Sequence, residues 1–260
     1  MGRVIAITNQ KGGVGKSTTA VNLSAALALL GHHVLLVDMD PQAHATTGVG
    51  VERSTVGISV YDVIINGLTF QSVLIPTRIK GLDLAPSSIH LAGAEVELVP
   101  LPQREHRLRG AMRPVRDWYD LILVDCPPSV GLLTINAMVA ADEVLIPIQC
   151  EYYALEGLSQ LLNSLNLVRR QLNPTLRLGG ILLTMHDART NLSEQVAAEV
   201  RRHFRDDVFQ TVIPRSVRLA EAPSFGQPVV TYDPSSRGAE AYMALAREVN
   251  ARVGQPVAVE

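Results

Sequence analysis

The sequence has little of several features that other classes of protein need. Its 260 residues include two cysteines, Cys126 and Cys150, which form neither a disulfide framework nor a zinc-binding pattern. No apolar run approaches the roughly 18 residues of a membrane-spanning helix. Only 18% of the residues are charged and the formal net charge is −2, which excludes nucleic-acid binding through overall basicity. Because 47% of the residues are hydrophobic, we expect a large core and no extensive disorder.

Lysine is also scarce, and its distribution is informative. The chain has twenty arginines but only three lysines, and two of these, Lys11 and Lys16, lie in one loop, NQKGGVGKST (9–18). The Gly-Lys-Ser ending is typical of a phosphate-binding loop, in which a compact ammonium contacts phosphate oxygens. Gln10 occupies the position where the usual pattern has its first glycine, and Lys11 follows it. The role of this second lysine needs an explanation.

Apolar, β-rich segments alternate with helical patterns along the chain. We expect strands at 3–9, 33–40, 120–128, 142–149, 178–185 and 208–214. We expect helices at 16–31, 154–172, 191–204 and about 236–253, the first closed by Gly31 and the third capped by Asn191 or Ser193. This alternation predicts an α/β fold, a P-loop NTPase-like domain with a mostly parallel twisted sheet and helices on both faces.

The rest of the chain is less regular but suggests no boundary. Residues 50–118 are expected to hold short helices and an edge strand near LDLAP (82–86). We therefore expect a single domain over residues 1–260, with a core of about 3–253. Because the first expected strand begins at Arg3, we expect no signal peptide and a cytoplasmic protein.

The loop lies between an expected strand and an expected helix, which is the context of a nucleotide site. Its glycines let backbone N–H groups approach phosphate oxygens, and the helix adds the positive end of its dipole. Lys16 is expected to reach the β- and γ-phosphates of ATP, Ser17 to bind Mg²⁺ and Thr18 to contact the α-phosphate. The loop residues expected to bind the nucleotide are Lys11, Gly12, Gly13, Val14, Gly15, Lys16, Ser17 and Thr18.

Three aspartates follow buried strands and complete the expected site. Asp125 ends LILVD, where a carboxylate can hold Mg²⁺ through water. Asp38 and Asp40 follow the second strand, at the carboxyl edge of the sheet, where α/β folds bind ligands. Asp40 lies further out, so we expect it to orient the attacking water, while Asp38 has a structural or magnesium-shell role. All three residues also fit turns before a proline.

Further motifs lead to a resemblance. KGGVGKST, with a lysine at its head, is similar to the deviant Walker-A loop of the ParA/MinD class of ATPases. The chain resembles the ParA/Soj chromosome-partitioning ATPases from about residue 3 to about residue 250. The blocks that carry this resemblance include VLLVDMDPQ, LILVDCPPSVGLLTINAM, LLTMHDARTNLSEQV, TVIPRSVRLAEAPSFGQPV and SSRGAEAY.

The resemblance implies a role for the second lysine. In that family two subunits enclose two ATP molecules, and Lys11 would contact the phosphates held by the partner subunit. Gly12 would lie where the subunits approach too closely for a Cβ. A second ammonium near the leaving phosphate would stabilise developing charge, as an arginine finger does. The resemblance thus makes Lys11, Lys16 and Asp40 catalytic; on the loop alone, Lys11 also fits a solvated surface residue.

The resemblance also implies binding surfaces outside the loop. Pro214 and Ser216 would lie against the adenine, and Arg189 and Arg218 would bind double-stranded DNA without sequence preference, in a salt-sensitive manner. Alternatively, Arg189 and Arg218 are ordinary solvent-exposed residues, because residues 151–260 carry twelve arginines and twelve acids and therefore have no excess of positive charge. The implied partners are a second copy of the chain, DNA and a ParB/Spo0J-type centromere-binding protein that stimulates hydrolysis. The location would be nucleoid-associated.

The chain departs from the family pattern in two places. Ala43 and His44 replace a common glycine and asparagine, which affects the loop after Asp40. Ser216 replaces a common asparagine, which weakens its assignment to the adenine. We expect His44 to be a loop residue rather than a catalytic one.

Three other functions share features of this sequence. A MinD-like membrane-cycling ATPase would need a basic amphipathic helix at the C-terminus, whereas this chain ends NARVGQPVAVE, so we expect no membrane partner. An iron–sulfur reductase would need exposed cysteines, and both cysteines here resemble small buried residues. A metabolic P-loop synthase would need a dedicated substrate pocket, for which the sequence gives no sign.

Overall fold

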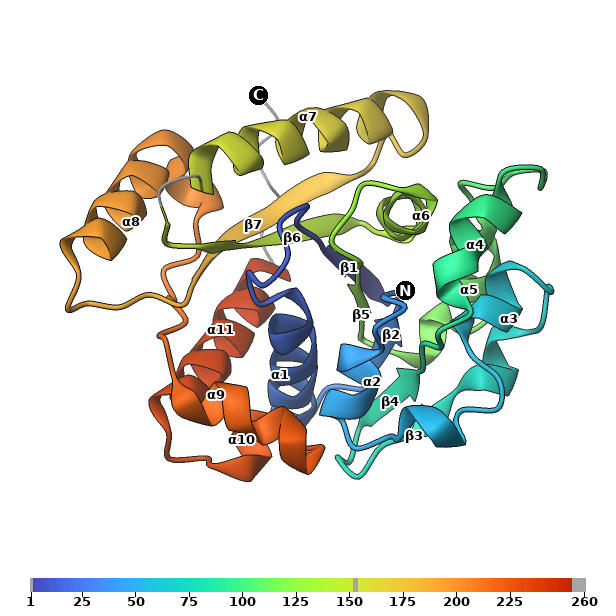
Figure 1. Cartoon of the computed structure of the whole chain (residues 1–260), viewed down its shortest axis with the longest axis horizontal. Helices are drawn as coiled ribbons and strands as arrows, with labels where there is room; N and C mark the ends of the chain where they lie inside the picture. Colours follow the sequence, from blue (N-terminus) through green and yellow to red (C-terminus); the bar gives the residue numbers. More distant parts are fainter. Residues whose placement is uncertain (1, 152–153, 254–260) are drawn as a thin grey trace.

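The fold is built on one twisted sheet with helices on both faces (Figure 1). The computed structural model describes residues 2–151 and 154–253, and within them seven strands pair in the order β3-β4-β2-β5-β1-β6-β7. Neighbouring strands are parallel except for β3 and β4. The strands are β1 Arg3–Ile7, β2 Val34–Asp38, β3 Ile75–Pro76, β4 Leu82–Ala85, β5 Leu121–Asp125, β6 Glu143–Gln149 and β7 Arg177–Thr184. The expected α/β class is confirmed.

Helices of very different lengths connect these strands. The α-helices are α1 Lys16–Leu29, α2 His44–Gly48, α3 Val60–Ile64, α4 Leu91–Leu98, α5 Arg107–Met112, α6 Leu132–Ala140, α7 Ala154–Gln171, α8 Asn191–Phe204, α9 Val217–Glu221, α10 Val229–Tyr232 and α11 Arg237–Val253. Short 3₁₀ helices are η1 Arg53–Thr55, η2 Phe70–Val73, η3 Arg116–Trp118, η4 Arg205–Asp207 and η5 Ala222–Phe225. The short helices at 44–64 and 91–112 confirm the irregular pattern expected between residues 50 and 118.

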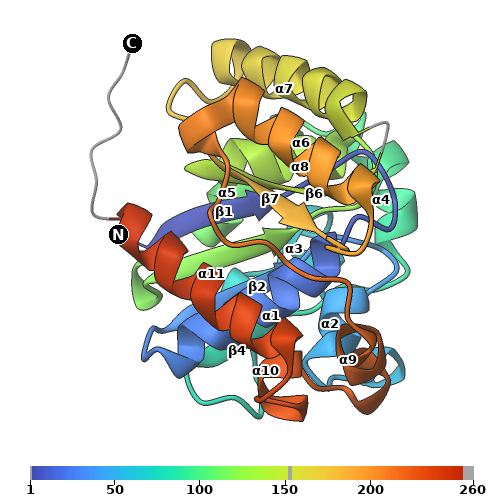
Figure 2. The same ribbon diagram turned by 90° about the vertical axis from the view of Figure 1, so that its left-hand side faces the viewer.

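The sheet separates two hydrophobic clusters. Along β1, Val4 and Ala6 belong to one cluster, while Ile5 and Ile7 belong to the other, as the alternation of a strand requires. Helices α4 to α8 cover the first face, and α1 and α11 cover the second (Figures 1 and 2). Because both faces are covered, the central strands are apolar along their whole length.

Helix α1 is buried on nearly all sides between the sheet and α11. Its sequence is accordingly apolar or small around the whole circumference, as for a helix inside a core. The Thr19 hydroxyl lies 3.2 Å from the Tyr242 hydroxyl of α11, so the first turn is tied to the C-terminal helix. This packing fixes the helix that begins at the phosphate loop. On α11 itself, Ala239, Ala246 and Val249 are buried.

The strand expected at 208–214 is wrong. This segment contacts β7 only through isolated bridges, Ile181 with Val208 and His186 with Pro214. Between them the chain leaves the sheet, because the Glu248 carboxylate of α11 accepts the backbone N–H groups of Gln210 and Thr211 at 2.8 and 2.9 Å. The Glu248 side chain thus takes the place of the backbone hydrogen bonds that a neighbouring strand would provide.

Two smaller expectations also need correction. The strand near LDLAP exists as β4, but it is not at the edge, because the two-residue strand β3 pairs antiparallel outside it. Helix α8 is capped by Thr190, whose side chain accepts the N–H of Ser193, rather than by Asn191 or Ser193. Both cysteines are buried, as expected.

Among the described residues, none of the helices combines the length and the apolar composition required to cross a bilayer. The end of the chain on which the sequence argument about a membrane helix depends, residues 254–260, lies outside the described residues.

Asn173 joins the end of α6 to the start of β7. It is 2% exposed, and its Nδ2 donates to the carbonyls of Met138, Val139 and Ala141 at 2.7 to 3.2 Å. These are carbonyls at the end of a helix, which have no partner within the helix itself.

We predict that Asn173→Ala lowers the free energy of unfolding by about 2–4 kcal/mol, because it leaves buried carbonyls unpaired. Urea denaturation of the nucleotide-free protein measures the change. Asn163→Ala, at an exposed position of α7, is the control and should change stability by less than about 0.5 kcal/mol. Equal effects of the two substitutions would contradict this role.

Candidate nucleotide-binding site

The loop after β1 leaves its N–H groups available to a ligand. Gly13 and Gly15 have φ values of 75° and 89°, which favour glycine. Gly15 precedes α1 without a side-chain cap, and the first turn of α1 contains no acidic residue. Free N–H groups and the positive end of the helix dipole therefore face the same space, as anion binding requires.

Two side chains outside the loop hold it in place. Asn9 accepts the N–H of Lys11 at 3.0 Å and donates to the carbonyl of Pro147 in β6 at 2.7 Å. Thr184, at the end of β7, donates to the carbonyl of Val14 at 2.9 Å. The loop is thus fixed to the carboxyl ends of two strands before any ligand binds.

Lys16 is the cation inside the site. It is 6% exposed, and its Nζ donates to the carbonyl of Lys11 at 3.0 Å. Burial lowers the pKa of Lys16, while the nearby carboxylates of Asp125 and Asp40 act in the opposite direction. The ammonium is therefore held under the loop, close to the space where the N–H groups point.

Asp38 has a structural role in this arrangement. Its Oδ2 accepts both the N–H and the hydroxyl of Thr46 at 2.7 Å, and its Oδ1 accepts the N–H of Asp40 at 3.1 Å. Burial raises the pKa of Asp38 to about 6, although the hydrogen bonds from Thr46 act against this. Asp38 thus connects the end of β2 to α2 and shapes the loop that carries Asp40.

Asp40 is held by its backbone, which leaves part of its side chain available. Its carbonyl accepts the Ser87 hydroxyl at 2.6 Å, and its Oδ1 accepts the N–H of Gln42 at 2.9 Å. Asp40 lines the pocket in front of Lys16 and Ser17. Of the two aspartates after β2, Asp40 is the one placed to contact a ligand.

Asp125 is buried completely and lacks a hydrogen-bond partner for either oxygen among the described residues. It ends β5 in register with Asp38, the last residue of β2. Burial raises the pKa of Asp125 well above its usual range and the charge of Asp38 adds to this, although the nearby Ser17 hydroxyl and the charge of Lys16 act against it. An unpartnered buried carboxylate beside a phosphate loop fits a site for Mg²⁺ with its bound water.

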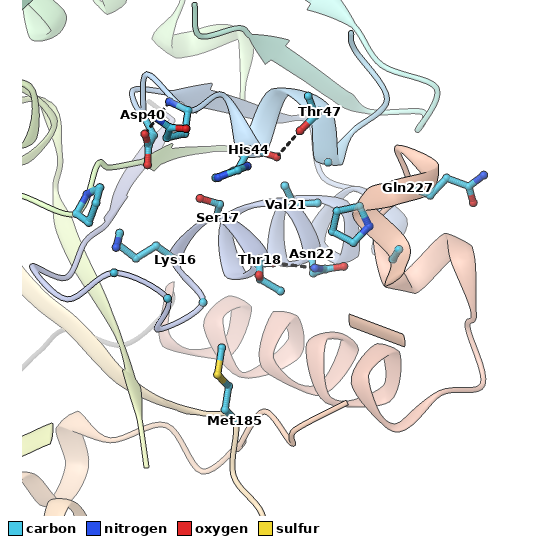
Figure 3. Close-up of a pocket in the computed structure, with 18 residues that line it drawn as sticks. Lys16, Ser17, Thr18, Val21, Asn22, Asp40, His44, Thr47, Met185 and Gln227 are labelled. Atoms are coloured by element: carbon cyan, nitrogen blue, oxygen red, sulfur yellow. Dashed lines mark hydrogen bonds between the residues drawn. The ribbon is translucent and has the colours of Figure 1, made fainter. Parts of the chain in front are cut away.

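A pocket of about 390 Å³ lies in front of Lys16 and Asp40, while Asp38 and Asp125 are not part of its lining (Figure 3). Lys16, Ser17 and Thr18 lie along the start of α1, and Asp40 and His44 lie across the pocket from them. The pocket lining includes Gly12, Gly13 and Gly15, so the structure brings together most of the loop residues expected from the sequence. Val14 is buried behind the loop instead.

Lys11 lies outside this pocket. Its Nζ forms an ion pair with Glu151 at 2.8 Å, and both side chains are about half exposed. Glu151 also accepts a hydrogen bond from Gln149 at 2.6 Å. The two lysines of the loop therefore have different environments, one buried at the phosphate space and the other at the surface.

The departures at Ala43 and His44 keep the shape of the loop after Asp40. Ala43 has φ 53° and ψ 36°, a left-handed conformation that glycine adopts more easily. The expectation that His44 is a loop residue is wrong, because His44 begins α2, where it forms part of the pocket wall. The loop thus keeps the backbone expected of a glycine at residue 43, and it adds an imidazole beside the nucleotide site.

The other expected residues lie away from the pocket. Met185 lines the pocket, and Pro214 forms a backbone bridge with the next residue, His186. However, neither Pro214 nor Ser216 lines the pocket. Arg189 is 86% exposed and forms a bidentate pair with Asp187 at 2.7 and 2.8 Å, which holds the pKa of Asp187 well below its usual range. Arg218 pairs with Glu221 at 2.9 Å and with Asp233 at 3.2 Å.

Sequence reasoning missed one wall of the pocket. Ala222, Pro223 and Gln227 line it from the segment around η5. Asn22 holds this segment against α1, because its Oδ1 accepts the N–H of Val229 at 2.6 Å. These residues belong to the block TVIPRSVRLAEAPSFGQPV, which carries the family resemblance. Ala222, Pro223 and Gln227 have no charged or catalytic group, so their residue types do not indicate a pocket wall.

The geometry defines a P-loop nucleotide-binding protein, and comparisons with known proteins place it further. A family model described as an AAA domain matches residues 2–178. The chain is 59% identical over 251 residues to the sporulation initiation inhibitor protein Soj of Bacillus subtilis (strain 168), covering 96% of this chain and 99% of that protein. It is 53% identical over 252 residues to the chromosome partitioning protein ParA of Myxococcus xanthus (strain DK1622), covering 97% and 89%.

A solved structure of cobyrinic acid a,c-diamide synthase from Mycobacterium smegmatis with bound ADP and magnesium has a TM-score of 0.84 and 37% identity, covering 95% of this chain and 93% of that one. The higher identity to the Soj and ParA proteins, over nearly their whole length, decides between these relatives. The chain belongs to the ParA/Soj family of chromosome-partitioning ATPases.

We predict that Asp125→Asn raises the thermal stability of the nucleotide-free protein, by about 1 kcal/mol or more near pH 7. A raised carboxyl pKa means that the fold disfavours the charged form, so the penalty exists above the ordinary carboxyl pKa and declines as the pH falls towards it. The advantage of Asp125→Asn over the native protein should therefore shrink from about pH 7 to about pH 5. Calorimetric unfolding at both pH values measures it.

Asp38→Asn is the matched control, because it changes the neighbouring buried aspartate in the same way. It should destabilise the protein, since the amide cannot accept all the N–H and O–H donors that now point at Asp38. Destabilisation by both substitutions would show that the unpartnered state of Asp125 has no energetic cost.

Proposed function

We propose that this protein is an ATP-dependent partition switch, in which ATP and Mg²⁺ drive dimerisation, the dimer binds DNA without sequence preference, and hydrolysis releases it. The observation that carries this proposal is the separation of the two loop lysines. Lys16 is buried at the phosphate space, whereas Lys11 lies outside the pocket and is paired with a surface carboxylate. A lysine that a loop presents to the outside can reach a nucleotide bound by a second subunit.

The surroundings of Gly12 support the same arrangement. Gly12 does not have a positive φ, and a Cβ built on it meets no atom of this chain within 4 Å. Neither backbone strain nor packing within the subunit therefore requires glycine at this position. A requirement from outside the subunit, the close approach of a partner, accounts for it.

Hydrolysis is assigned to residues on the pocket wall. Asp40 would orient the water that attacks the γ-phosphate, and Lys16 and the partner's Lys11 would stabilise the charge that develops. Mg²⁺, when bound, would be held by the Ser17 hydroxyl and, through water, by Asp125, and would supply positive charge to the phosphates. The bound ADP and magnesium of the Mycobacterium smegmatis relative support this choice of ligands.

DNA binding is assigned to Arg189 and Arg218. Each is paired with acids of its own chain, so each must exchange a carboxylate for a phosphate when DNA binds. Such exchange weakens binding and makes it sensitive to salt, as suits a reversible switch. The adenine contacts of Pro214 and Ser216, stimulation by a ParB/Spo0J-type protein and a location on the nucleoid remain part of the proposal on the strength of the family resemblance.

Asp40→Ala tests the switch as a whole. We predict that this variant binds ATP, hydrolyses it at least about a hundredfold more slowly, and accumulates as a DNA-bound dimer. Light scattering measures the dimer, and fluorescence anisotropy with a short duplex measures DNA binding, without nucleotide, with ADP and with ATP. Asp206→Ala, at an exposed acid on η4, is the control and should behave like the native protein.

The same assay separates the parts of the proposal. Arg189→Ala should lose DNA affinity, while Arg202→Ala, a similarly exposed arginine of α8, should not. Normal hydrolysis by Asp40→Ala would refute the role of Asp40. Dimers that form with ATP but ignore DNA would overturn the DNA assignment and favour a membrane-cycling ATPase, which binding to anionic lipid vesicles would then test.

Gly12→Val tests the role of the partner subunit. We predict that it retains ATP binding but remains monomeric with ATP, because the added side chain occupies the space needed by the second subunit. The rate of ATP hydrolysis should fall by at least about a hundredfold, since the partner's Lys11 no longer reaches the phosphates. Equilibrium nucleotide binding and light scattering together make the distinction.

Gly110→Val is the matched control, because a Cβ at Gly110 also meets nothing within 4 Å. It should still dimerise with ATP. If Gly12→Val dimerises as well, the close approach at Gly12 is excluded; if it loses ATP binding, the glycine serves the loop itself.

A further inference from the structure

A second pocket lies at the opposite edge of the sheet and is lined by arginines. It is formed where β1 and β7 begin and where α7 ends, and its volume is about 630 Å³. Four separate elements contribute its arginines, Arg3 from β1, Arg116 from η3, Arg169 from α7 and Arg177 from β7. Residues far apart in the sequence thus place like charges around one cavity.

These arginines outnumber the carboxylates that neutralise them. Arg3 and Arg177 both form ion pairs with Glu143, and the distance from Arg177 Nη2 to Glu143 Oε1 is 3.0 Å. Arg116 donates to Asp142 at 2.5 Å. Three guanidinium groups therefore share two carboxylates among the described residues, and Arg169 adds a fourth positive charge, which gives four arginines against two acids.

The excess also concerns hydrogen-bond donors. Arg3 leaves Nε and Nη1 buried and without an acceptor among the described residues. Arg169 forms neither an ion pair nor a hydrogen bond with any part of the chain that the structure describes. Buried donors normally find acceptors, so the cluster is short of acceptors, and the exposed Arg169 has its donors available to an anion from outside.

The dipole of α7 does not account for the cluster. Basic residues in the last turn of a helix complement its negative end, which explains Arg169 and its neighbour Arg170. It does not explain why Arg3 and Arg116, which belong to other elements, line the same cavity.

We propose that this pocket binds a phosphate group, supplied either by the backbone of duplex DNA or by a free phosphorylated molecule. The planar fork of a guanidinium matches the oxygens of a phosphate, and several converging forks can hold one anion from different sides. The pocket is distinct from the nucleotide site, because β1 begins at Arg3 and ends just before the phosphate loop, about 13 Å further along a five-residue strand.

The first experiment uses a small probe. The native protein is saturated with ADP and Mg²⁺, which fills the nucleotide site, and inorganic pyrophosphate is then added while the melting temperature is followed. We expect pyrophosphate to raise the melting temperature of the native protein and of Arg170→Glu but not of Arg169→Glu. Arg170 is the matched control, because it adjoins Arg169, is also exposed and does not line the pocket.

The second experiment uses a duplex oligonucleotide with the ATP-bound protein and therefore rests on the proposed function. If DNA supplies the phosphate, Arg169→Glu should bind about tenfold more weakly than Arg170→Glu, and the slope of log affinity against log salt should fall by about 1.

Each combination of results has one interpretation. A loss specific to Arg169 in the DNA assay, with or without the same loss for pyrophosphate, identifies the DNA backbone as the source. A loss with pyrophosphate alone identifies a free phosphorylated molecule. Equal behaviour of the two variants in both assays overturns the proposal. If the native protein does not bind DNA at all, the proposed function fails, while the pyrophosphate assay still tests whether the arginine pocket binds phosphate.

Discussion

The concentration of negative charge around a single buried lysine is the constraint on which the nucleotide site depends. Asp38 and Asp125 end neighbouring strands in register, and Asp40 follows two residues later. Among the described residues that line the pocket, Lys16 is the only lysine or arginine, and the charges of Asp125 and Asp40 act on it. Hydrogen bonds from Thr46 satisfy Asp38, whereas among the described residues Asp125 has only weak support from the nearby Ser17 hydroxyl and the charge of Lys16. This excess of acidic groups over basic ones is what suits the site to the cation proposed above.

This constraint explains why the loop contains two lysines. A second lysine of the same subunit beside Lys16 would bring two like charges together inside the buried site. Lys11 avoids this, because it is directed to Glu151 at the surface. A loop fixed by Asn9 and Thr184 can hold one lysine within and the other outside. The scarcity of lysine elsewhere in the chain made this pair visible in the sequence.

Apolar runs predicted the central strands well, because strands covered on both faces must be apolar throughout. The loop, Asp40 and Asp125 were predictable for a related reason, since polar residues directly after such strands stand out. The segment 208–214 has the same apolar character, yet Glu248, distant in sequence, takes its N–H groups and prevents a strand. The η5 wall of the pocket and the arginine pocket depend likewise on contacts between distant segments, and no local pattern encodes them.

The parallel sheet also accounts for the separation of the two pockets. Its strands all run in one direction apart from β3, so residues that begin strands gather at one edge and residues that end them gather at the other. Arg3 and Arg177 begin β1 and β7, while Asp38 and Asp125 end β2 and β5. One edge thus carries an excess of guanidinium and the other an excess of carboxylate. On the two proposals above, a phosphate would bind at the carboxylate edge together with a metal ion and the loop N–H groups, whereas the arginine edge would bind it directly. The same anion chemistry would then be available at both ends of the sheet under different conditions.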